Sequence, residues 1–525
     1  MKTVPISIFN DVLGPVMRGP SSSHTAASVR IASLARMLLE KELRQAKFYF
    51  SNDGSLATTH ESQGTDIGLA AGLAGIEISS QNLLNSLEIA QTKGIEIIFE
   101  VTDFPNNHPN TYKICLTDIN GDKLKMTALS TGGGMLLVTE IDSFPVEMYG
   151  DCWEAFYYLH TNDDEALGLV NSLFDSMPLY DKPFGSHVSL FEGRALLNLK
   201  FAREPKSDLL QEISCLLNDA AYRFASPVLP ILRSIECKCL FSTATEIEKL
   251  FNTDEKQLWE IGLEYEAVRG SISKEAVWEQ AAYIHDTMRQ SVNTGVAGTE
   301  YNDRILGHQS YLLEKNKRRI LDTPLFNMVS KYVMAVMETK SSFGTIVAAP
   351  TAGSCGAIPG AILGCVDVLG LSREDGIKAI LAAGTIGILI AARSTFSAEV
   401  AGCQAECGSA SGMAAAAIVQ LTGGNASEAI DAASFALQNI FGMTCDPVAG
   451  RVEVPCLGKN ILAATNAIVA ANLTVAGMNT VIPLDETIEA MDKVGRSLPF
   501  ELRCTGLGGL SVTPTSKKIE EEMRK

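Results

Sequence analysis

"SASGMAAAAIVQLTGG", residues 409–424, decides the fold class of the longest part of the chain. Alanine, glycine and serine dominate this helix-length segment, and a helix of such small residues can pack closely against neighbours on most of its faces. Residues 459–477, "KNILAATNAIVAANLTVAG", have the same character. Because strand signals are few from about residue 263 onward, we predict an all-α domain over 263–525 with buried central helices.

The composition indicates a globular protein of several domains. At 525 residues the chain is too long for one hydrophobic core, and roughly two to four domains are expected. Hydrophobic residues make up 46% of the chain and charged residues 20%, which argues against disorder. The net charge of −18 argues against nucleic acid or an anionic membrane as a partner.

The sequence also indicates the cellular compartment in which the protein is expected. No secretory signal is visible in the first 25 residues, and the longest apolar run, 380–392, is too short to cross a bilayer. This run is expected to be a core helix. Twelve cysteines without an export signal indicate a reducing compartment, where cysteines are more often buried, catalytic or metal-bound than disulfide-bonded. We therefore expect a cytoplasmic protein without a membrane segment.

Ahead of the helical domain we predict an α+β domain over 1–152 and a ferredoxin-like domain over 154–232. In the first, residues 47–51 and 95–101 are rich in β-forming side chains, while 25–43 has apolar residues at helical spacing.

The ferredoxin-like domain is expected to follow the order β-α-β-β-α-β. Its strands are predicted at 155–160, 186–191 and 195–200, with a weaker one near 228–232, and a hairpin turns at Glu192-Gly193-Arg194. The apolar faces of its two helices are formed by Leu167, Val170, Leu173 and Phe174, and by Leu209, Leu210, Ile213, Leu216 and Leu217. The stretch 233–262, acidic and polar from 245 on, is predicted to be a linker.

Three cysteines, Cys403, Cys445 and Cys456, fall within two short stretches of the helical domain. Cys445 and Cys456 close a loop that begins with an Asp-Pro turn, and a disulfide, a metal site or unrelated core thiols would each explain the pair. Three converging thiolates can hold an iron–sulfur cluster, and with only three protein ligands one iron stays open to substrate. On spacing alone, zinc and plain core thiols compete with this hypothesis.

Two stretches of the first domain carry hydroxyls and imidazoles in turns. "GPSSSHT" (19–25) places Ser21, Ser22, Ser23, His24 and Thr25 at a predicted helix start, where exposed N–H groups favour a carboxylate. A simple helix cap with an incidental histidine is the alternative. "NHPN" (107–110) offers His108 and Asn110 in a Pro-turned loop, which by itself is more typical of a surface turn. Either histidine could act as a general base.

Long motifs in both halves of the chain resemble the iron–sulfur L-serine dehydratases. The α subunit of that family is resembled by "GCQAE" (402–406), "TCDPVAG" (444–450), "VEVPC" (452–456), "PTAGSCGAIPG" (350–360), "GSASGMAAAA" (408–417) and "TGLGGLSVTPT" (505–515). Its β subunit is resembled by "GPVMRGPSSSHTA" (14–26), "GSLATT" (54–59), "GTD" (64–66) and "NHPNT" (107–111). Residues 154–232 are similar to the ACT module of some β subunits. The resemblance covers nearly the whole chain, with the β part first.

The resemblance implies a [4Fe-4S] cluster bound by Cys403, Cys445 and Cys456. A β-hydroxy amino acid would bind the open iron through its hydroxyl, and elimination followed by imine hydrolysis would turn serine into pyruvate and ammonia. It also implies that His24 or His108 is the base. The implied substrate-binding residues are Ser21, Ser22, Ser23, Thr25, Thr65, Asp66 and Asn110. The ACT-like module would bind an amino-acid effector or pair two subunits as a homodimer.

The remaining cysteines are predicted not to be ligands. Cys407 and Cys355 stand in site motifs at positions where the family commonly has a small or aliphatic residue, so we expect them to be pocket neighbours. Single core thiols are predicted at Cys115, Cys152, Cys215, Cys365 and Cys504, and the Cys237-x-Cys239 pair lacks metal partners.

Three motifs depart from the family pattern. Gln63 stands where a histidine is typical, with His60 nearby, and "TFSA" (395–398) replaces a Ser-Ile-Ser-Gly motif. "DRILGH" (303–308) replaces a glycine-rich motif and adds Arg304 and His308; Arg304 could pair with an anionic group of the substrate.

Serine is the substrate expected by default, and three alternatives remain. The same chemistry could act on threonine, cysteine or an anionic analogue. The chain could instead be a regulatory protein that binds an amino acid without catalysis, or a pyridoxal-phosphate enzyme.

Overall fold

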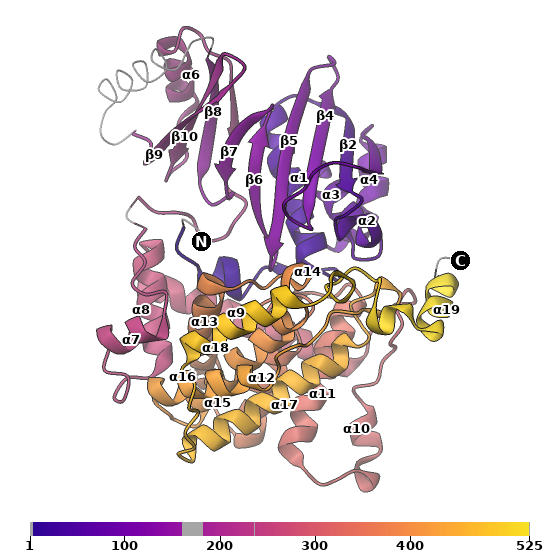
Figure 1. Ribbon diagram of the computed structural model, residues 1–525, viewed down its shortest axis with the longest axis vertical. Helices are drawn as coiled ribbons and strands as arrows, with labels where there is room; N and C mark the ends of the chain where they lie inside the picture. The colour runs from indigo at the N-terminus through magenta and orange to yellow at the C-terminus, as the bar shows by residue number, and fades with distance from the viewer. Residues whose placement is uncertain (1–3, 160–181, 236, 524–525) are drawn as a thin grey trace.

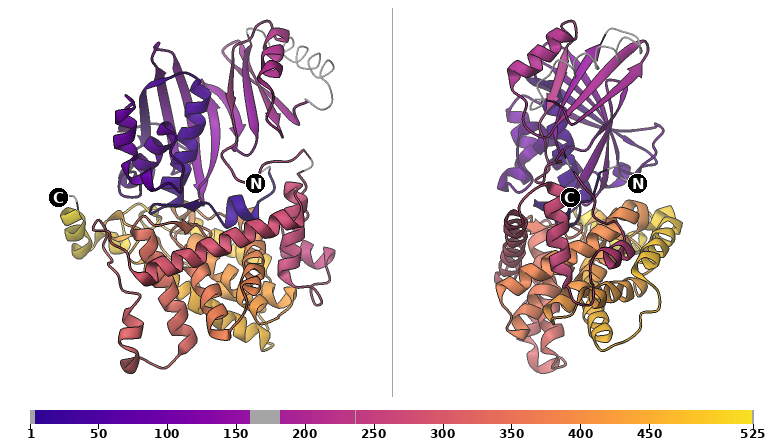
Figure 2. Two further views of the ribbon diagram at one scale, coloured as in Figure 1. Left: turned by 180° about the vertical axis from the view of Figure 1, so that it is seen from behind. Right: turned by 90° about the vertical axis from the view of Figure 1, so that its left-hand side faces the viewer.

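The computed structural model describes residues 4–159, 182–235 and 237–523. Figure 1 shows two β-sheets side by side above a large helical body, and Figure 2 shows the same division from behind and from the side. The α+β and helical regions are therefore present as predicted.

The first region contains a mixed six-stranded sheet in the order β3-β2-β4-β5-β6-β7. Its strands are β2 (Leu43–Ser51), β3 (Glu96–Thr102), β4 (Thr111–Asp118), β5 (Lys123–Gly132), β6 (Met135–Ile141) and β7 (Phe144–Met148). β2 and β3 are parallel and the other neighbours antiparallel. The helices beside the sheet are α1 (Ala27–Leu39), α2 (Leu56–Thr59), α3 (Thr65–Ala74) and α4 (Ser86–Thr92). Ile31 and Leu34 of α1 share a core with Phe48 and Phe50 of β2.

The second sheet is antiparallel, in the order β11-β8-β10-β9. It comprises β8 (Trp153–Leu159), β9 (Gly185–Phe191), β10 (Arg194–Phe201) and β11 (Tyr222–Ala225), with α6 (Ser207–Leu216) beside it. The hairpin turns at Glu192 and Gly193, both with positive φ. The predicted helix with Leu167, Val170, Leu173 and Phe174 lies outside the described residues. Its resemblance to an ACT module, and the effector and homodimer that this implies, stay predictions.

The last strand was predicted at the wrong place, 228–232. Pro227 and Pro230 remove two ladder donors from that stretch, and the N–H groups of Val228 and Leu229 donate to the Gly150 carbonyl instead. The strand β11 instead forms ahead of Pro227, at Tyr222–Ala225.

The predicted linker over 233–262 is also wrong. α7 (Ala244–Leu250) and the whole first turn of α8 (Leu258–Gly270) fall inside it, and Ile247, Leu258 and Ile261 are buried in the helical core. The polar residues that suggested a linker occupy the outer faces of these helices, so polarity alone was misleading. The helical region therefore begins near residue 241.

The helical core is built from small residues, as predicted. Its main helices are α9 (Lys274–Ala297), α11 (Pro324–Ser341), α12 (Ala357–Leu369), α13 (Arg373–Arg393), α15 (Ser409–Leu421), α16 (Ala426–Gln438), α17 (Cys456–Val475) and α18 (Leu484–Ser497). Every residue of α15 is buried. α13 is long and apolar enough to cross a membrane, but 78% of its apolar window is buried inside the protein, as for a core helix.

The domain boundary predicted at residue 152 overlooks an insertion of the N-terminus into the helical core. A single π-helical turn, Ile8–Val12, packs on α13, and β1 (Val16–Met17) pairs antiparallel with β12 (Ile346–Val347). Glycines of α13 make the room: a Cβ on Gly387 would lie 2.0 Å from Val12 Cγ1. The two domains are thus joined by a shared core, because apolar residues near the N-terminus find no partner in their own sheet.

Gly387→Ala is expected to destabilise the protein by about 1–3 kcal/mol through overpacking against Val12. Gly458→Ala in α17 is the matched control, because nothing lies within 4 Å of its added Cβ and alanine favours a helix by roughly 0.5–1 kcal/mol. Urea unfolding of both variants measures the difference. Equal stability of the two would contradict the packing described here.

Candidate active site

His24 is completely buried at the start of α1, with both ring nitrogens engaged. The Thr59 hydroxyl donates to the Ser55 carbonyl (2.6 Å), so at its 2.9 Å contact with His24 Nε2 it must accept. The proton of the neutral imidazole is therefore on Nε2. Nδ1 is left as the basic nitrogen, 3.0 Å from Ser21 Oγ. Ser21 also caps the turn that carries His24, because its hydroxyl accepts from the His24 N–H at 3.2 Å.

Glu399 reaches His24 from the helical domain. It belongs to the single turn α14 (Ala398–Ala401), and its Oε1 lies 3.5 Å from His24 Nδ1. The Ser397 hydroxyl donates to the other carboxylate oxygen at 2.6 Å. Burial lowers the pKa of His24, and the Glu399 charge opposes this. The segment 395–398 therefore lies at the site, and the serine that orients this carboxylate, Ser397, matches the second serine of the Ser-Ile-Ser-Gly motif.

His108 and Asn110 lie in the loop between β3 and β4. The Asn110 N–H donates to His108 Nδ1 (3.1 Å), and burial lowers the pKa of His108 while Glu399 raises it. Asn110 is fully buried, yet neither its amide nitrogen nor its amide oxygen has a hydrogen-bond partner within the described residues. Since an unpaired buried amide is costly, this side chain is best explained by a polar ligand.

Asn110→Leu is expected to leave stability nearly unchanged, because no hydrogen bond is lost, while any substrate contact of the amide is removed. Asn10→Leu is the control: its buried amide bonds both backbone groups of Ile231 (2.7 and 3.0 Å), so the change should cost about 1–3 kcal/mol. Thermal unfolding compares the two. A large loss for Asn110→Leu would mean that the amide is structural.

The other predicted residues of the first domain mostly hold this site together. The Ser22 hydroxyl accepts from Ala352 N (3.2 Å), and the Thr25 hydroxyl donates to the Gln63 carbonyl (3.0 Å). The Ser23 carbonyl accepts from Tyr112 (3.5 Å), and the Thr65 hydroxyl is buried near the same tyrosine. Asp66 pairs with His60 (2.7 Å). The contact with Ala352 places Ser22 at the domain boundary, whereas Thr25 is bonded within the first domain.

A cleft of about 840 Å³ leads from the surface to this site. Thr59, His60 and Asp66 line it from the first domain, and Gly450 and Arg451 from the helical domain. Thr59 also bonds His24, so the Thr59 side chain is all that separates the cleft from the buried imidazole along this contact.

The predicted ligands Cys403, Cys445 and Cys456 are all buried in the helical domain. Cys403 precedes a wide turn, Cys445 lies in a loop, and Cys456 begins α17. A hydrogen bond from Cys407 lowers the pKa of the Cys403 thiol to about 7. The three thiols are close enough to influence one another, and no disulfide joins the cysteines of the described chain.

Two lysines lie next to the cysteines. Lys459 donates to Thr444 O (2.5 Å) and Asp446 Oδ1 (2.8 Å), and the nearby Cys403 and Cys445 thiols help to raise its pKa against burial. Lys340 donates to the Val452 carbonyl close to Cys456. Both cations suit a site that holds several thiolates. Sequence reasoning missed them because lysines are common and lie in no recognised motif.

Glu406 connects the cysteines with the histidines. It accepts from the Thr351 hydroxyl (2.6 Å), and burial followed by the neighbouring Cys403 raises the pKa of its carboxyl group. Glu399 lies close enough to add to this shift. The arrangement therefore combines imidazoles, carboxyl groups, an unpaired amide and buried thiols along one domain boundary.

Comparison with known families accounts for this combination. The model of the serine dehydratase alpha chain matches residues 247–511, and that of the beta chain matches residues 11–141. The chain belongs to the serine dehydratase family. The β part precedes the α part in one chain, as predicted, and the second sheet lies between the two matches.

Relatives in this family include fused and separate chains. A probable L-serine dehydratase alpha chain of Bacillus subtilis is 41% identical over 254 residues, which cover 48% of this chain and 84% of the relative. L-serine dehydratases of Streptomyces coelicolor and Haemophilus influenzae are each 26% identical, over 97% of this chain and 98% and 99% of the relatives. Because the last two matches span nearly the whole of both chains, this serine dehydratase homologue shares its fused arrangement with these relatives.

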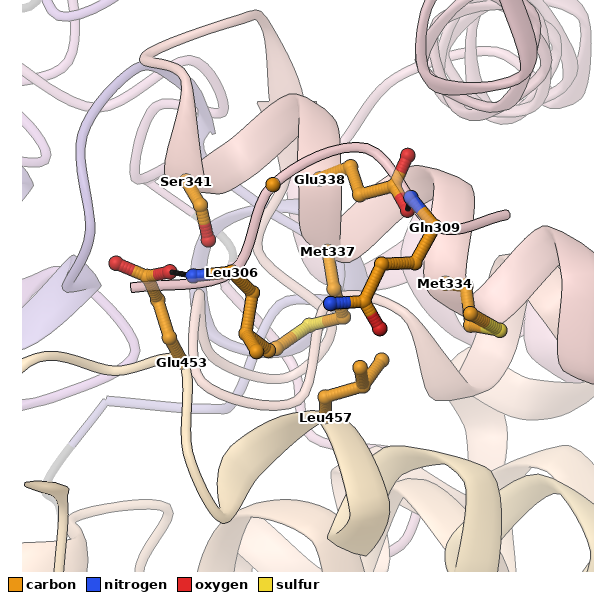
Figure 3. Close-up of a pocket in the computed structure, with 9 residues that line it drawn as sticks. Leu306, Gln309, Met334, Met337, Glu338, Ser341, Glu453 and Leu457 are labelled. Carbon is orange, nitrogen blue, oxygen red and sulfur yellow. Dashed lines mark hydrogen bonds between the residues drawn. The ribbon is translucent and has the colours of Figure 1, made fainter. Parts of the chain in front are cut away.

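Arg304 is not brought to the histidines. Its guanidinium donates to the hydroxyl and the carbonyl of Thr299, both at 2.7 Å, in the loop before it. Two carboxylates hold the rest of "DRILGH" and the residue after it (Figure 3): Glu453 accepts from Leu306 N (2.9 Å), and Glu338 accepts from Gln309 N (2.6 Å). His308 also bonds Glu338 (2.8 Å). The structure thus gives Arg304 and His308 anchoring partners, and the expected anion contact of Arg304 has no support in it.

The predictions for single cysteines hold in part. Cys152 and Cys365 are buried, but Cys215 is exposed, because Leu210 and Ile213 occupy the sheet-facing side of α6. Cys504 is buried but not isolated, since it lies against Cys445. Gln63 contacts Cys504, and His60 pairs with Asp66, so the His60 imidazole does not occupy the position of Gln63.

Proposed function

We propose that this serine dehydratase homologue converts L-serine into pyruvate and ammonia, with a [4Fe-4S] cluster on Cys403, Cys445 and Cys456. The observation that carries the proposal is the buried meeting of His24 Nδ1 and Glu399, 3.5 Å apart, from two domains. An imidazole whose basic nitrogen faces a carboxylate is a suitable acceptor for the α-proton of an amino acid, because the carboxylate stabilises the imidazolium that forms. The names of the relatives support serine as the substrate.

The residues present fit an iron–sulfur cluster. Thiolates are the ligands that such clusters use, and Lys459 and Lys340 bring positive charge to the three buried thiols. No group of three or more His, Cys, Asp or Glu side chains in the described chain is arranged around one metal ion. When bound, the cluster would supply a Lewis acid for the departing hydroxide.

The side chains of the site have separate tasks in this proposal. The Asn110 amide, fully buried and unpaired among the described residues, binds the polar groups at the substrate α-carbon. His24 Nδ1 accepts the α-proton, and Glu399 stabilises the imidazolium that results. The C–O bond to the β-carbon breaks, hydroxide leaves with its electron pair, and an enamine remains. This tautomerises to an imine, and water hydrolyses it to pyruvate and ammonia.

Other substrates keep the same chemistry. Threonine differs by one methyl group, and cysteine would release sulfide in place of water. An anionic substrate has weaker support, because Arg304 is already bonded to Thr299. A regulatory protein that binds an amino acid without catalysis would use the unpaired Asn110 amide but would leave the buried His24–Glu399 pair without a task.

Anaerobic purification tests the proposal, with iron, sulfide and pyruvate measured on the same sample. About four irons per chain, visible absorption that bleaches in air, and pyruvate formed from serine without added pyridoxal phosphate are expected. Threonine, cysteine and phosphoserine serve as competing substrates. Iron-free, colourless and inactive protein would contradict both the cluster and the enzyme.

A further inference from the structure

Cys504 lies against one of the predicted cluster ligands through both its backbone and its thiol. The Cys504 N–H donates to the Cys445 carbonyl (3.0 Å), and the Cys445 N–H donates to the Leu502 carbonyl (2.8 Å). The two thiols lie close enough for Cys504 to raise the pKa of the Cys445 thiol, and both residues are buried. Cys504 adopts a φ of 59°, which is unusual for a residue other than glycine. The backbone thus fixes its position relative to Cys445.

Gln63 of the first domain holds the Cys504 sulfur from the other side. The Gln63 side-chain nitrogen donates to Cys504 Sγ at 3.5 Å, while the Gln63 oxygen is farther from the same sulfur, at 4.0 Å. Gln63 is 1% exposed, and its own carbonyl accepts from the Thr25 hydroxyl beside His24. A chain of contacts therefore runs from the histidine segment through Gln63 and Cys504 to Cys445.

We propose that Cys504, oriented by Gln63, is a positioning residue that donates an S–H hydrogen bond to the Cys445 thiolate. The inference rests on the proposed cluster. A ligand cysteine is a thiolate without a hydrogen, so in this pair only Cys504 can donate. The Gln63 N–H donates to the Cys504 sulfur, and the Gln63 oxygen at 4.0 Å is a weak acceptor for the Cys504 hydrogen, whereas a thiolate at Cys445 would be a charged acceptor. Hydrogen bonds to cluster sulfurs stabilise the cluster and set its reduction potential.

Gln63 and Cys504 therefore act as one unit. The glutamine replaces the histidine expected at this position with an uncharged donor that suits a sulfur acceptor. The departure at Gln63 thus changes the surroundings of a ligand and leaves His24 as the proton acceptor.

A double-mutant cycle with Cys504→Ala, Gln63→Leu and the combined variant tests this proposal. The protein is isolated anaerobically, and the rate at which visible absorption bleaches in air is measured together with the cluster reduction potential. Cys504→Ala is expected to keep about four irons, to bleach about fivefold faster as for loss of one hydrogen bond, and to have a lower potential. Gln63→Leu should change both quantities in the same direction, and the double variant should resemble Cys504→Ala, because the two act through one thiol.

Cys365→Ala is the matched control, since Cys365 is a buried thiol of α12 affected by burial alone. Circular dichroism confirms folding, and Gln63→Leu tests the proposal if Cys504→Ala fails to fold. Bleaching rates and potentials equal to those of the parent protein would overturn it. Loss of iron in Cys504→Ala would also overturn it, by making Cys504 a ligand. A parent protein without iron would instead contradict the proposed function.

Discussion

Replacing Cys403, Cys445 or Cys456 by alanine, one at a time, is expected to abolish serine deamination and to remove most of the iron. Each thiol is buried, and alanine offers no ligand, so the remaining two cysteines cannot hold a cluster in place. Iron should fall from about four per chain to below about one. Iron and sulfide analysis of anaerobic samples, with pyruvate formation measured in parallel, checks this result.

Cys365→Ala serves as the control here as well and should keep iron and activity. Cys407→Ala is informative because the Cys407 side chain lowers the pKa of the neighbouring Cys403 thiol and accepts a hydrogen bond from Asn460 Nδ2 at 3.5 Å. As a neighbour of a ligand, it should keep the iron. Full activity in any of the three ligand variants would show that the cluster assignment is wrong.

His24→Gln is expected to lower kcat by about 10²–10⁴-fold, the usual contribution of a general base. Glutamine can still bond Thr59, so the variant should fold and keep its iron, while the basic nitrogen facing Glu399 is lost. Pyruvate formation under saturating serine measures the effect. His108→Gln gives the comparison, and a larger loss there than at His24 would assign the base to His108.

The pH dependence follows from the burial of His24. Burial lowers the pKa of His24 below its usual value of about 6.5, and a base must be uncharged to accept a proton. Activity should therefore be constant through neutral pH and fall only as pH drops through the lowered pKa. Because Glu399 raises this pKa, Glu399→Gln should move the inflection to still lower pH and reduce kcat. An inflection moving upward would contradict the pairing.

The sequence predicted those features that depend on residues close together in the chain. Small residues at helical spacing in 409–424 and 459–477 predicted buried helices, because any helix made of them must find close neighbours. Strands β2 and β3 and the β9–β10 hairpin were recognisable from local pattern and turn residues. Long motifs placed the three cysteines and the two histidines in one family without any coordinates.

Contacts between distant segments were decided by the tertiary structure alone. No local pattern shows that Glu399 meets His24, that Cys504 lies on Cys445, or that Val12 fits over Gly387. These side chains are adjacent because an apolar N-terminal turn is more stable in the helical core than in water, which draws the first domain onto the second. Sequence determines what each segment can bury, whereas the packing of whole domains determines which polar groups meet where they close.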